Sequence, residues 1–494
     1  MNHLPNTKNR LHKVDSCLAV NSTTIHELFM HSEDIQTQTF TFGNDQYSYT
    51  VLFVYADGMI SIDRFQHTIL PIFNRFFAEL RYPLTNDYLA EMLPLPTYHV
   101  EQFHEFIVSP LFRGQLIFFI DTIDVAHLVD VSDLPGRQPE EPGNEISIRG
   151  PKDGFVEDVA TNVALVRKRL PTDSLCTEQF TVGTRSQTRV SILYINDILD
   201  PAILAELKKR IQNIQTEAIY ASSQFEAYLV DEKWSLVPRF SFTGRPDFVA
   251  GSLLRGRFAV VIDGTPTVIL GPVNLSFLFQ SAEDEYTLYP FLIIQRLLRF
   301  LGATISLILP GLYVAIVSYH IDRIPLTLLG TFVVARHGIP FPTPIEVLLI
   351  LVLFEMLREA GNRLPAGLGQ TLAVVGGLII GQAAIDAGLT SPTVLVVTGT
   401  TAVASFTLSN QALAGALTIF RIVILLFASI LGEFGFLLGV FAVLIYLSTV
   451  RSFGVPYLSP LSPWRTNDVI ATITSMGSKL SRKRPLILRT RKKS

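Results

Sequence analysis

Cysteine is almost absent from the sequence, and so are the motifs by which common enzymes are recognised. The two cysteines, Cys17 and Cys176, lie in different segments, which argues against a disulfide framework and a zinc site. Neither a GxGxxG after a strand nor GxxxxGKS/T, HExxH or GxSxG occurs. His99 and His104 lack the spacing of helical metal ligands. We therefore expect no enzymatic activity, no metal site and no cofactor.

Charge is also scarce. Charged residues make up 17% of the 494 residues and hydrophobic residues 48%, with a mean hydropathy of +0.36. Soluble domains carry about 25% charged residues, so part of the chain is expected to lie in lipid. The net charge of -3 gives no reason to expect nucleic-acid binding. The first ten residues, MNHLPNTKNR, lack the apolar run of a signal peptide, which predicts that the first half stays in the cytosol.

The first half contains the same order of predicted strands and helices twice. RGQLIFFIDT (113–122) resembles RGRFAVVIDG (255–264), and a strand, a turn and an amphipathic helix precede each of them at a similar offset. In the second copy, Asp200 and Pro201 predict the start of the helix, because they suit its N-cap and first turn. An alternative is that Arg-Gly and Asp merely mark the ends of unrelated strands.

This duplication predicts an N-terminal region of two related α/β modules, over 39–135 and 153–285. The segment between them, 136–152, is dense in proline, glycine and charge and is predicted to be a linker. A polar segment over 1–38 precedes the first module.

The second half predicts an all-α, polytopic transmembrane domain over 286–463, followed by a basic tail over 464–494. Leu301–Tyr319 is an uncharged run long enough to span a bilayer, and Pro310 within it predicts a kink. Residues 413–450 are too long for one crossing, which predicts a break at Gly432–Glu433.

Basic residues set the expected orientation. Arg296 and Arg299 precede the first predicted span, and the tail is rich in lysine and arginine. By the positive-inside rule, both flanks of the transmembrane domain are expected on the cytoplasmic side. The number of crossings is then even, four or six.

Several charged residues lie within the apolar half. Residues 324–363 are interrupted by Pro340, Pro342 and Pro344 and predict a broken or re-entrant segment, followed by an amphipathic helix near 344–363. We expect the charges to mark either a functional acidic site or an interfacial helix whose acids pair with Arg358 and Arg363. Arg421 and Glu433 are expected to pair with each other or with a neighbour, or to contact a cavity. The candidate intramembrane or interfacial charges are Glu346, Glu355, Arg358, Glu359, Arg421 and Glu433.

The span over 368–388 is unusual for a lipid-facing helix because it combines glycine with glutamine. Small residues let helices approach closely, whereas amides face a partner or water. We consider two interpretations, a passage lined by one face of this helix and tight helix packing. The candidate pore-lining residues are Gln370, Val374, Val375, Gly377, Leu378, Gly381 and Gln382.

The order of several segments resembles one family, the A subunits of bacterial spore germinant receptors of the GerA type. The segments are GPKDGFVEDVATNVALVRKRLP, LLRGRFAVVIDGTP, FQSAEDEYTLYPFLIIQRLLRFLGATISLILPGLYVA, PFPTPIEVLLILVLFEMLREAGNRLP, GGLIIGQAAIDAGLTSP and RSFGVPYLSPLSP. One departure is Gly244 in FTGRP, where many relatives have an acidic residue, so a salt bridge of that residue cannot be carried over.

The resemblance implies a subunit of a nutrient germinant receptor, with cytosolic modules and a domain in the spore inner membrane. It implies a transporter-like B subunit and a lipoprotein C subunit as partners. It also implies a ring-shaped homo-oligomer, a pentamer, that forms a ligand-gated cation channel and releases ions early in germination.

Two rival functions stay open at the level of sequence. A secondary transporter would place its substrate site near 324–363 and would require inverted repeats in the membrane half, and none is visible. A non-conducting scaffold would cluster receptor partners without passing ions. The nutrient, the ion selectivity and the number of subunits cannot be read from the sequence.

Overall fold

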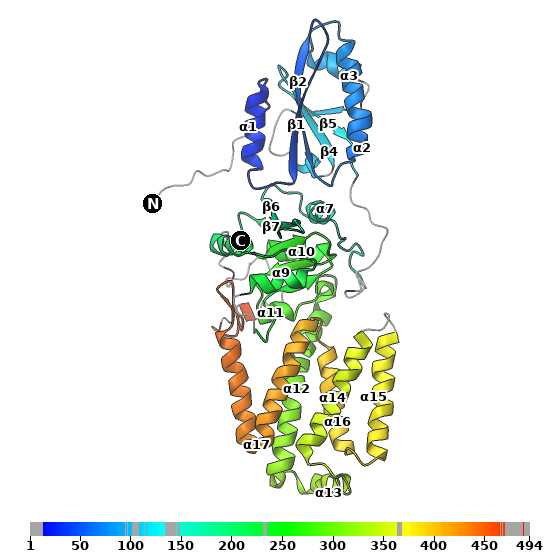
Figure 1. Ribbon diagram of the computed structural model, residues 1–494, viewed down its shortest axis with the longest axis vertical. Coiled ribbons are helices and arrows are strands. Elements are labelled where there is room, and N and C mark those ends of the chain that lie inside the picture. The colour runs from blue at the N-terminus through cyan, green and yellow to red at the C-terminus, as the bar shows by residue number, and fades with distance from the viewer. Residues whose placement is uncertain are drawn as a thin grey trace, which may run out of the picture.

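The computed structural model describes residues 13–93, 95, 97–100, 108–112, 114–133, 145, 149–230, 235–362, 368–464, 466, 468, 469 and 488. Two α/β modules and a helical bundle follow one another along the long axis of the molecule (Figure 1). The fold class predicted from the sequence is therefore confirmed.

The first module is built on an antiparallel sheet with the strand order β1-β2-β4-β5-β3. β4 and β5 pair antiparallel as a hairpin. The strands are β1 (Ile35–Gly43), β2 (Ser48–Ala56), β3 (Thr97–Val100), β4 (Gln115–Ile120) and β5 (Ala126–Asp130). The helices are α1 (Leu18–Leu28), α2 (Ile62–Arg64), the π-helix η1 (Phe65–Ile69), α3 (Leu70–Ala78), α4 (Asn86–Met92) and α6 (Val108–Leu111).

Both faces of this sheet are covered, which explains the continuous apolar run in β2. Side chains alternate between the faces of a strand. Val51 and Phe53 pack with Phe73 of α3 in one hydrophobic cluster, whereas Leu52 and Val54 pack with Ile25 of α1 in another. The strand is therefore buried from both sides.

The second module repeats the sheet with the order β6-β7-β9-β10-β8. Asp200 caps α8 by accepting a hydrogen bond from the backbone N–H of Ala202 at 2.9 Å, as predicted. The strands are β6 (Leu175–Val182), β7 (Thr188–Ile195), β8 (Ser241–Thr243), β9 (Phe258–Ile262) and β10 (Val268–Gly271). The helices are α7 (Val159–Arg169), α8 (Pro201–Gln212), α9 (Ser222–Leu229), α10 (Pro246–Leu254), α11 (Leu275–Leu278) and the 3₁₀ helix η2 (Ala282–Glu285).

The duplication includes the helices. α1 packs on β2 and β4 just as α7 packs on β7 and β9, and α6 and α10 correspond in the same way. α1 lies within residues 1–38, the segment that the sequence analysis placed outside the modules. Its Ile25 is nonetheless part of the core of the first module.

A buried ion pair joins the two modules. The guanidinium of Arg167 in α7 donates to both carboxylate oxygens of Asp34 at 2.7 and 2.9 Å, and it also donates to the backbone carbonyl of Leu175 at 2.6 Å. Arg167 is 1% exposed and stacks over the ring of Phe112, 4.4 Å from its centroid. A buried charge with this many partners fixes the orientation of one module against the other.

The bundle begins three residues after η2. α12 and α17 are, within the described residues, the two helices long and apolar enough to cross a membrane. Figure 1 shows α12, α14, α15, α16 and both limbs of α17 running roughly along the long axis, with α13 at the end remote from the modules. The bounds are α12 (Tyr289–Tyr319), α13 (Leu326–Ala335), α14 (Thr343–Asn362), α15 (Leu368–Asp386), α16 (Pro392–Phe406) and α17 (Gln411–Thr449).

Two predicted interruptions are present. α13 ends at Ala335 and α14 begins at Thr343, so the proline-containing stretch between them is not helical. Within α17, Gly432 has φ 63° and ψ -136°, which breaks the helix where the sequence predicts. The left-handed φ favours glycine at this position.

The chain returns to the second module after α17. Residues 451–456, which the sequence analysis included in 286–463, form the short hairpin β11 (Arg451–Ser452) and β12 (Val455–Pro456). Phe453 and Val455 insert into a hydrophobic cluster of the second module. The start and the end of the bundle's sequence are thus both attached to this module.

We predict that Asp34→Ala separates the two modules, because it leaves the charge of Arg167 buried without a counter-charge. Breaking a buried ion pair costs about 3–5 kcal/mol. Urea unfolding of the purified full chain, followed by limited proteolysis between the modules, measures this loss. Glu217→Ala is the control, because Glu217 pairs with Arg185 in an exposed ion pair worth at most about 1 kcal/mol. Equal effects of both variants would contradict the assigned role of Asp34.

Candidate functional site

A cavity of about 350 Å³ lies between α14, α15, α16 and α17. It brings together four residues that the sequence analysis singled out separately, Glu355, Arg358, Gly377 and Arg421. The other lining residues are Leu351, Phe354, Leu357, Leu395, Gly399, Ala402, Val403, Ser405 and Phe406. Most of the wall is apolar, and the charged groups converge on one part of it.

Charges in this cavity come from α14 and α17. Arg358 forms an ion pair with one carboxylate oxygen of Glu355, and the other oxygen lies 3.7 Å from Nη2 of Arg421. The prediction that an acid of α14 pairs with Arg358 is therefore correct for Glu355. Arg363 lies outside the described residues. Arg421 also approaches Ser306 of α12 at 3.5 Å.

Glu346 is fully buried in the bundle and does not contribute to the cavity. Its Oε1 accepts hydrogen bonds from the hydroxyls of Thr390 and Ser391, at 3.1 and 2.7 Å, and from the backbone N–H of Ser391. Ser391 is the N-cap of α16, and a helix N-terminus favours a negative charge. Glu346 therefore joins α14 to the N-terminus of α16.

Glu433 and Arg421 do not pair with each other. Glu433 lies at the break in α17, and its Oε1 forms an ion pair with Nη1 of Arg323 at 2.8 Å. Each of the two charges therefore contacts a neighbour, one of the outcomes expected from the sequence. Glu359 is the remaining charged candidate of α14, and it is not without an interaction partner.

The faces of α15 have different neighbours. A Cβ atom on Gly377 would lie 3.1 Å from Phe354 of α14, and one on Gly381 would lie 2.8 Å from Leu395 of α16. These glycines thus allow close packing within one protomer. Gln382 is exposed and donates to Asp386 at 3.0 Å. The side chains of Gln370, Val374, Val375 and Leu378 lie outside the described residues.

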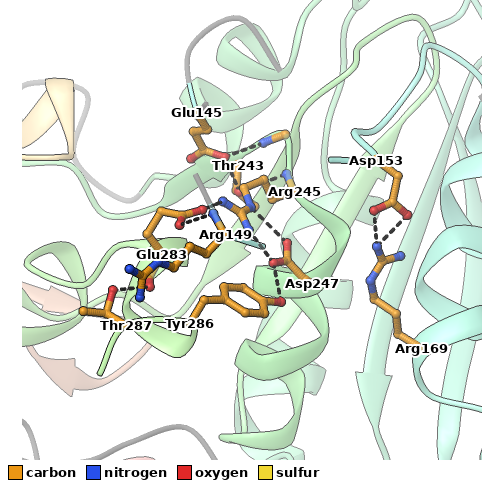
Figure 2. A network of polar contacts seen from close by, with 11 residues as sticks. Glu145, Arg149, Asp153, Arg169, Thr243, Arg245, Asp247, Glu283, Tyr286 and Thr287 are labelled. Atoms are coloured by element: carbon orange, nitrogen blue, oxygen red, sulfur yellow. Dashed lines mark hydrogen bonds and ion pairs between the residues drawn. The ribbon is translucent and has the colours of Figure 1, made fainter. Parts of the chain in front are cut away.

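A second polar cluster occupies the junction between the second module and the bundle. Figure 2 shows Arg245 at its centre, with Asp247, Glu283 and Tyr286 around it. The guanidinium pairs with Asp247 at 2.7 Å and with Glu283, and the hydroxyl of Tyr286 donates to Asp247 at 2.8 Å. Burial opposes the charge of Arg245, but these two carboxylates raise its pKa above the ordinary value.

The acids of η2 are held from different directions. Glu283 pairs with Arg245 of the second module, and Glu285 pairs with Arg255 at 2.7 Å. Asp284 lies between them, is 2% exposed, and pairs with two arginines of α12. The distances are 3.0 Å to Arg296 and 2.8 Å to Arg299. We call residues 283–285 the acidic clasp, because they tie the module to the first helix of the bundle.

The linker between the modules reaches the same junction. Glu145 accepts hydrogen bonds from the hydroxyl of Thr243 at 2.8 Å and from the backbone N–H of Gly244 at 3.1 Å (Figure 2). A carboxylate of the linker therefore lies directly beside Gly244. Burial raises the pKa of Glu145, although both hydrogen bonds favour its ionised form.

The linker also passes close to the clasp. A Cβ atom on Gly150 would lie 2.3 Å from Arg245. Glycine is therefore required where GPKDGF passes the guanidinium.

Sequence reasoning did not find the acidic clasp. The run AEDE appears only as part of a longer family segment, and three consecutive acids ordinarily indicate a solvated surface. The four arginines that hold them are distant in sequence or belong to a different predicted domain. The weak signal was that Arg296 and Arg299 precede an apolar span, which the sequence analysis explained by membrane orientation alone.

Comparison with known proteins places these features in a family. The Bacillus/Clostridium GerA spore germination protein family matches residues 23–487. "Spore germination protein XA" of Bacillus anthracis is 36% identical over 472 residues, 95% of this chain and 96% of that protein. "Uncharacterized membrane protein YfkQ" of Bacillus subtilis (strain 168) is 35% identical over 437 residues, 88% of this chain and 84% of that protein.

A solved structure is also similar. It is the N-terminal domain of the A subunit of the Bacillus megaterium spore germinant receptor GerK3, with 25% sequence identity and a TM-score of 0.40. The similarity covers 53% of this chain and 98% of that one.

We predict that Asp284→Asn loosens the bundle from the second module, because Arg296 and Arg299 lose their shared counter-charge. The expected result is a lower Tm of the detergent-solubilised full chain and faster protease cleavage near residue 287. Glu217→Gln is the matched control, since it removes one carboxylate from an exposed pair. An unchanged Tm and cleavage rate for Asp284→Asn would show that the acidic clasp does not hold the junction.

Proposed function

The chain belongs to the Bacillus/Clostridium GerA family of spore germination proteins, and on this premise we propose that it is the A subunit of a nutrient germinant receptor. In this proposal it forms a homo-oligomeric, ligand-gated cation channel in the spore inner membrane. Members of the family work within receptor complexes. Its partners are then a transporter-like B subunit and a lipoprotein C subunit, and its role is not catalytic.

The uncovered polar end of α15 is the observation that carries the channel proposal. Gly377 and Gly381 face helices of the same protomer, whereas Gln382 and Asp386 remain exposed. Polar side chains within a membrane domain face water or a protein partner. A ring of protomers, which we take to be a pentamer, would turn this face towards a shared axis and enclose a water path.

The pore-lining residues then divide between two roles. Gln382 would line the path, and the candidates Val375 and Leu378, which share its helix face, would form apolar rings that close it by dewetting. The candidates Gln370 and Val374 share the other face with Gly377 and Gly381. That face would permit close packing behind the pore.

The attachment of the bundle to the second module supports gating from the cytosolic side. The acidic clasp holds the start of α12, and the β11–β12 hairpin holds the end of α17. A rearrangement of the modules around the ring would therefore act on both ends of the bundle. In a closed ring, the contacts between the modules of neighbouring protomers would be heterologous.

We propose four or six crossings for the bundle, with α12 and the limbs of α17 among them. An even number keeps the modules and the basic tail on the same side, which we place in the cytoplasm. The proposed division of the chain keeps the linker 136–152, the second module 153–285, the helical domain from 286 and the tail 464–494, and it adds α1 to the first module.

Thiol modification tests the water path directly. We replace both native cysteines, introduce Gln382→Cys, and measure cation flux from proteoliposomes that contain the receptor complex and its nutrient. A charged, membrane-impermeant thiol reagent is expected to change the flux strongly, because residue 382 faces the water path.

Val396→Cys is the control for this experiment, because Val396 of α16 is 68% exposed on an apolar surface. Modification should leave the flux of this variant unchanged. If Gln382→Cys does not respond to the reagent, or if both variants respond equally, α15 does not line the path.

A further inference from the structure

Arg421 has fewer close partners than a buried guanidinium requires. Its side chain is 5% exposed. Its contacts are long, at 3.5 Å to Ser306, 3.4 Å to Thr418 and 3.7 Å to Glu355. Its Nε has no hydrogen-bond partner among the described residues. A guanidinium offers five N–H donors, and leaving it poorly paired in a buried site is costly.

The charges around the cavity leave a positive excess. Arg358 and Arg421 both approach Glu355, so two cations share one carboxylate. Glu355 is closer to Arg358 than to Arg421, which leaves Arg421 the less neutralised of the two. An anion is the natural complement of this part of the cavity, whereas a passing cation would be repelled by it.

The rest of the cavity suits an apolar body. Leu351, Phe354, Leu395, Val403 and Phe406 line it. Its volume of about 350 Å³ lies at the lower end of the range of about 300–1,000 Å³ typical of small-molecule sites. Such sites combine mostly apolar walls with a few converging polar groups that fix the orientation of the ligand.

We propose that this cavity binds a small molecule carrying one oxyanion, such as a carboxylate, on an apolar body. The oxyanion accepts hydrogen bonds from Arg421, and the body fills the space between α14 and α16. Arg–carboxylate contacts of this kind are charge-assisted and often bidentate. The proposal does not depend on conduction, because binding alone defines the site.

Gly399 allows a test that preserves every charge. It lines the cavity, and a Cβ atom built on it meets nothing within 4 Å. Gly399→Leu therefore adds a side chain at the cavity wall whose Cβ has open space, and it replaces glycine by a better helix former. Gly415→Leu is the matched control, because Gly415 also has open space at its Cβ position and lies outside the cavity.

The experiment measures the Tm of the purified full chain in detergent with increasing 3-methylbutanoate. The uncharged 3-methylbutanamide, of nearly the same shape, is the reference compound. We expect a saturable rise in Tm with the carboxylate and not with the amide. The rise should disappear in Gly399→Leu and persist in Gly415→Leu. In Arg421→Met the apparent affinity should fall by about tenfold or more, since a charged hydrogen bond is lost.

Three results would overturn the proposal. The first is an equal effect of carboxylate and amide on the Tm of the unmodified chain, or none. The second is a carboxylate response that Gly399→Leu retains. The third is stabilisation by phosphatidylglycerol alone, which would assign the cavity to the phosphate of a membrane lipid. Should Arg421→Met fail to fold, the two glycine variants still decide the outcome.

Discussion

The acidic clasp is the constraint on which the rest of the molecule depends. Three consecutive carboxylates that are largely shielded from solvent are costly unless each one finds a cation. Here Glu283 and Glu285 are paired within the second module, and Asp284 is paired with α12. A shift of α12 relative to the module would expose or separate charges that are now matched, so the two parts are expected to move together.

Packing reinforces this constraint where the chain leaves the bundle and returns to the second module. The backbone N–H of Leu275 donates to the backbone carbonyl of Tyr457 at 2.8 Å, and the side-chain amide of Asn274 donates to the backbone carbonyl of Ser459 at 3.0 Å. The hydrophobic cluster of the second sheet continues through Phe277 into Leu413 and Phe420 of α17. The second module therefore forms one core with the near end of the bundle, while Arg167 joins it to the first module. Force applied to either module reaches the helices through buried contacts.

The local signals in the sequence were sufficient for much of the fold. Period-two and helical patterns, the Asp200 cap and the repeated Arg-Gly strands predict both sheets, and the length of 413–450 predicts the break at Gly432. Tertiary partners could not be predicted in the same way. Glu346 was expected near an interface or at a functional acidic site. No local pattern indicates that it also accepts a hydrogen bond from Ser391, the N-cap of α16, 45 residues away. The convergence of Glu355, Arg358 and Arg421 on one cavity requires the relative positions of α14 and α17, which no local pattern contains.

Nutrient-triggered cation flux through the assembled receptor carrying Asp284→Asn is the most direct test of the coupling between the modules and the bundle. The oligomer is first verified by its mass in detergent, so that a failure to assemble is not mistaken for a failure to couple. The account predicts that the assembled variant loses most of its nutrient-triggered flux, because the modules no longer act on α12. Flux equal to that of the unmodified receptor, from an oligomer of the same mass, would contradict it.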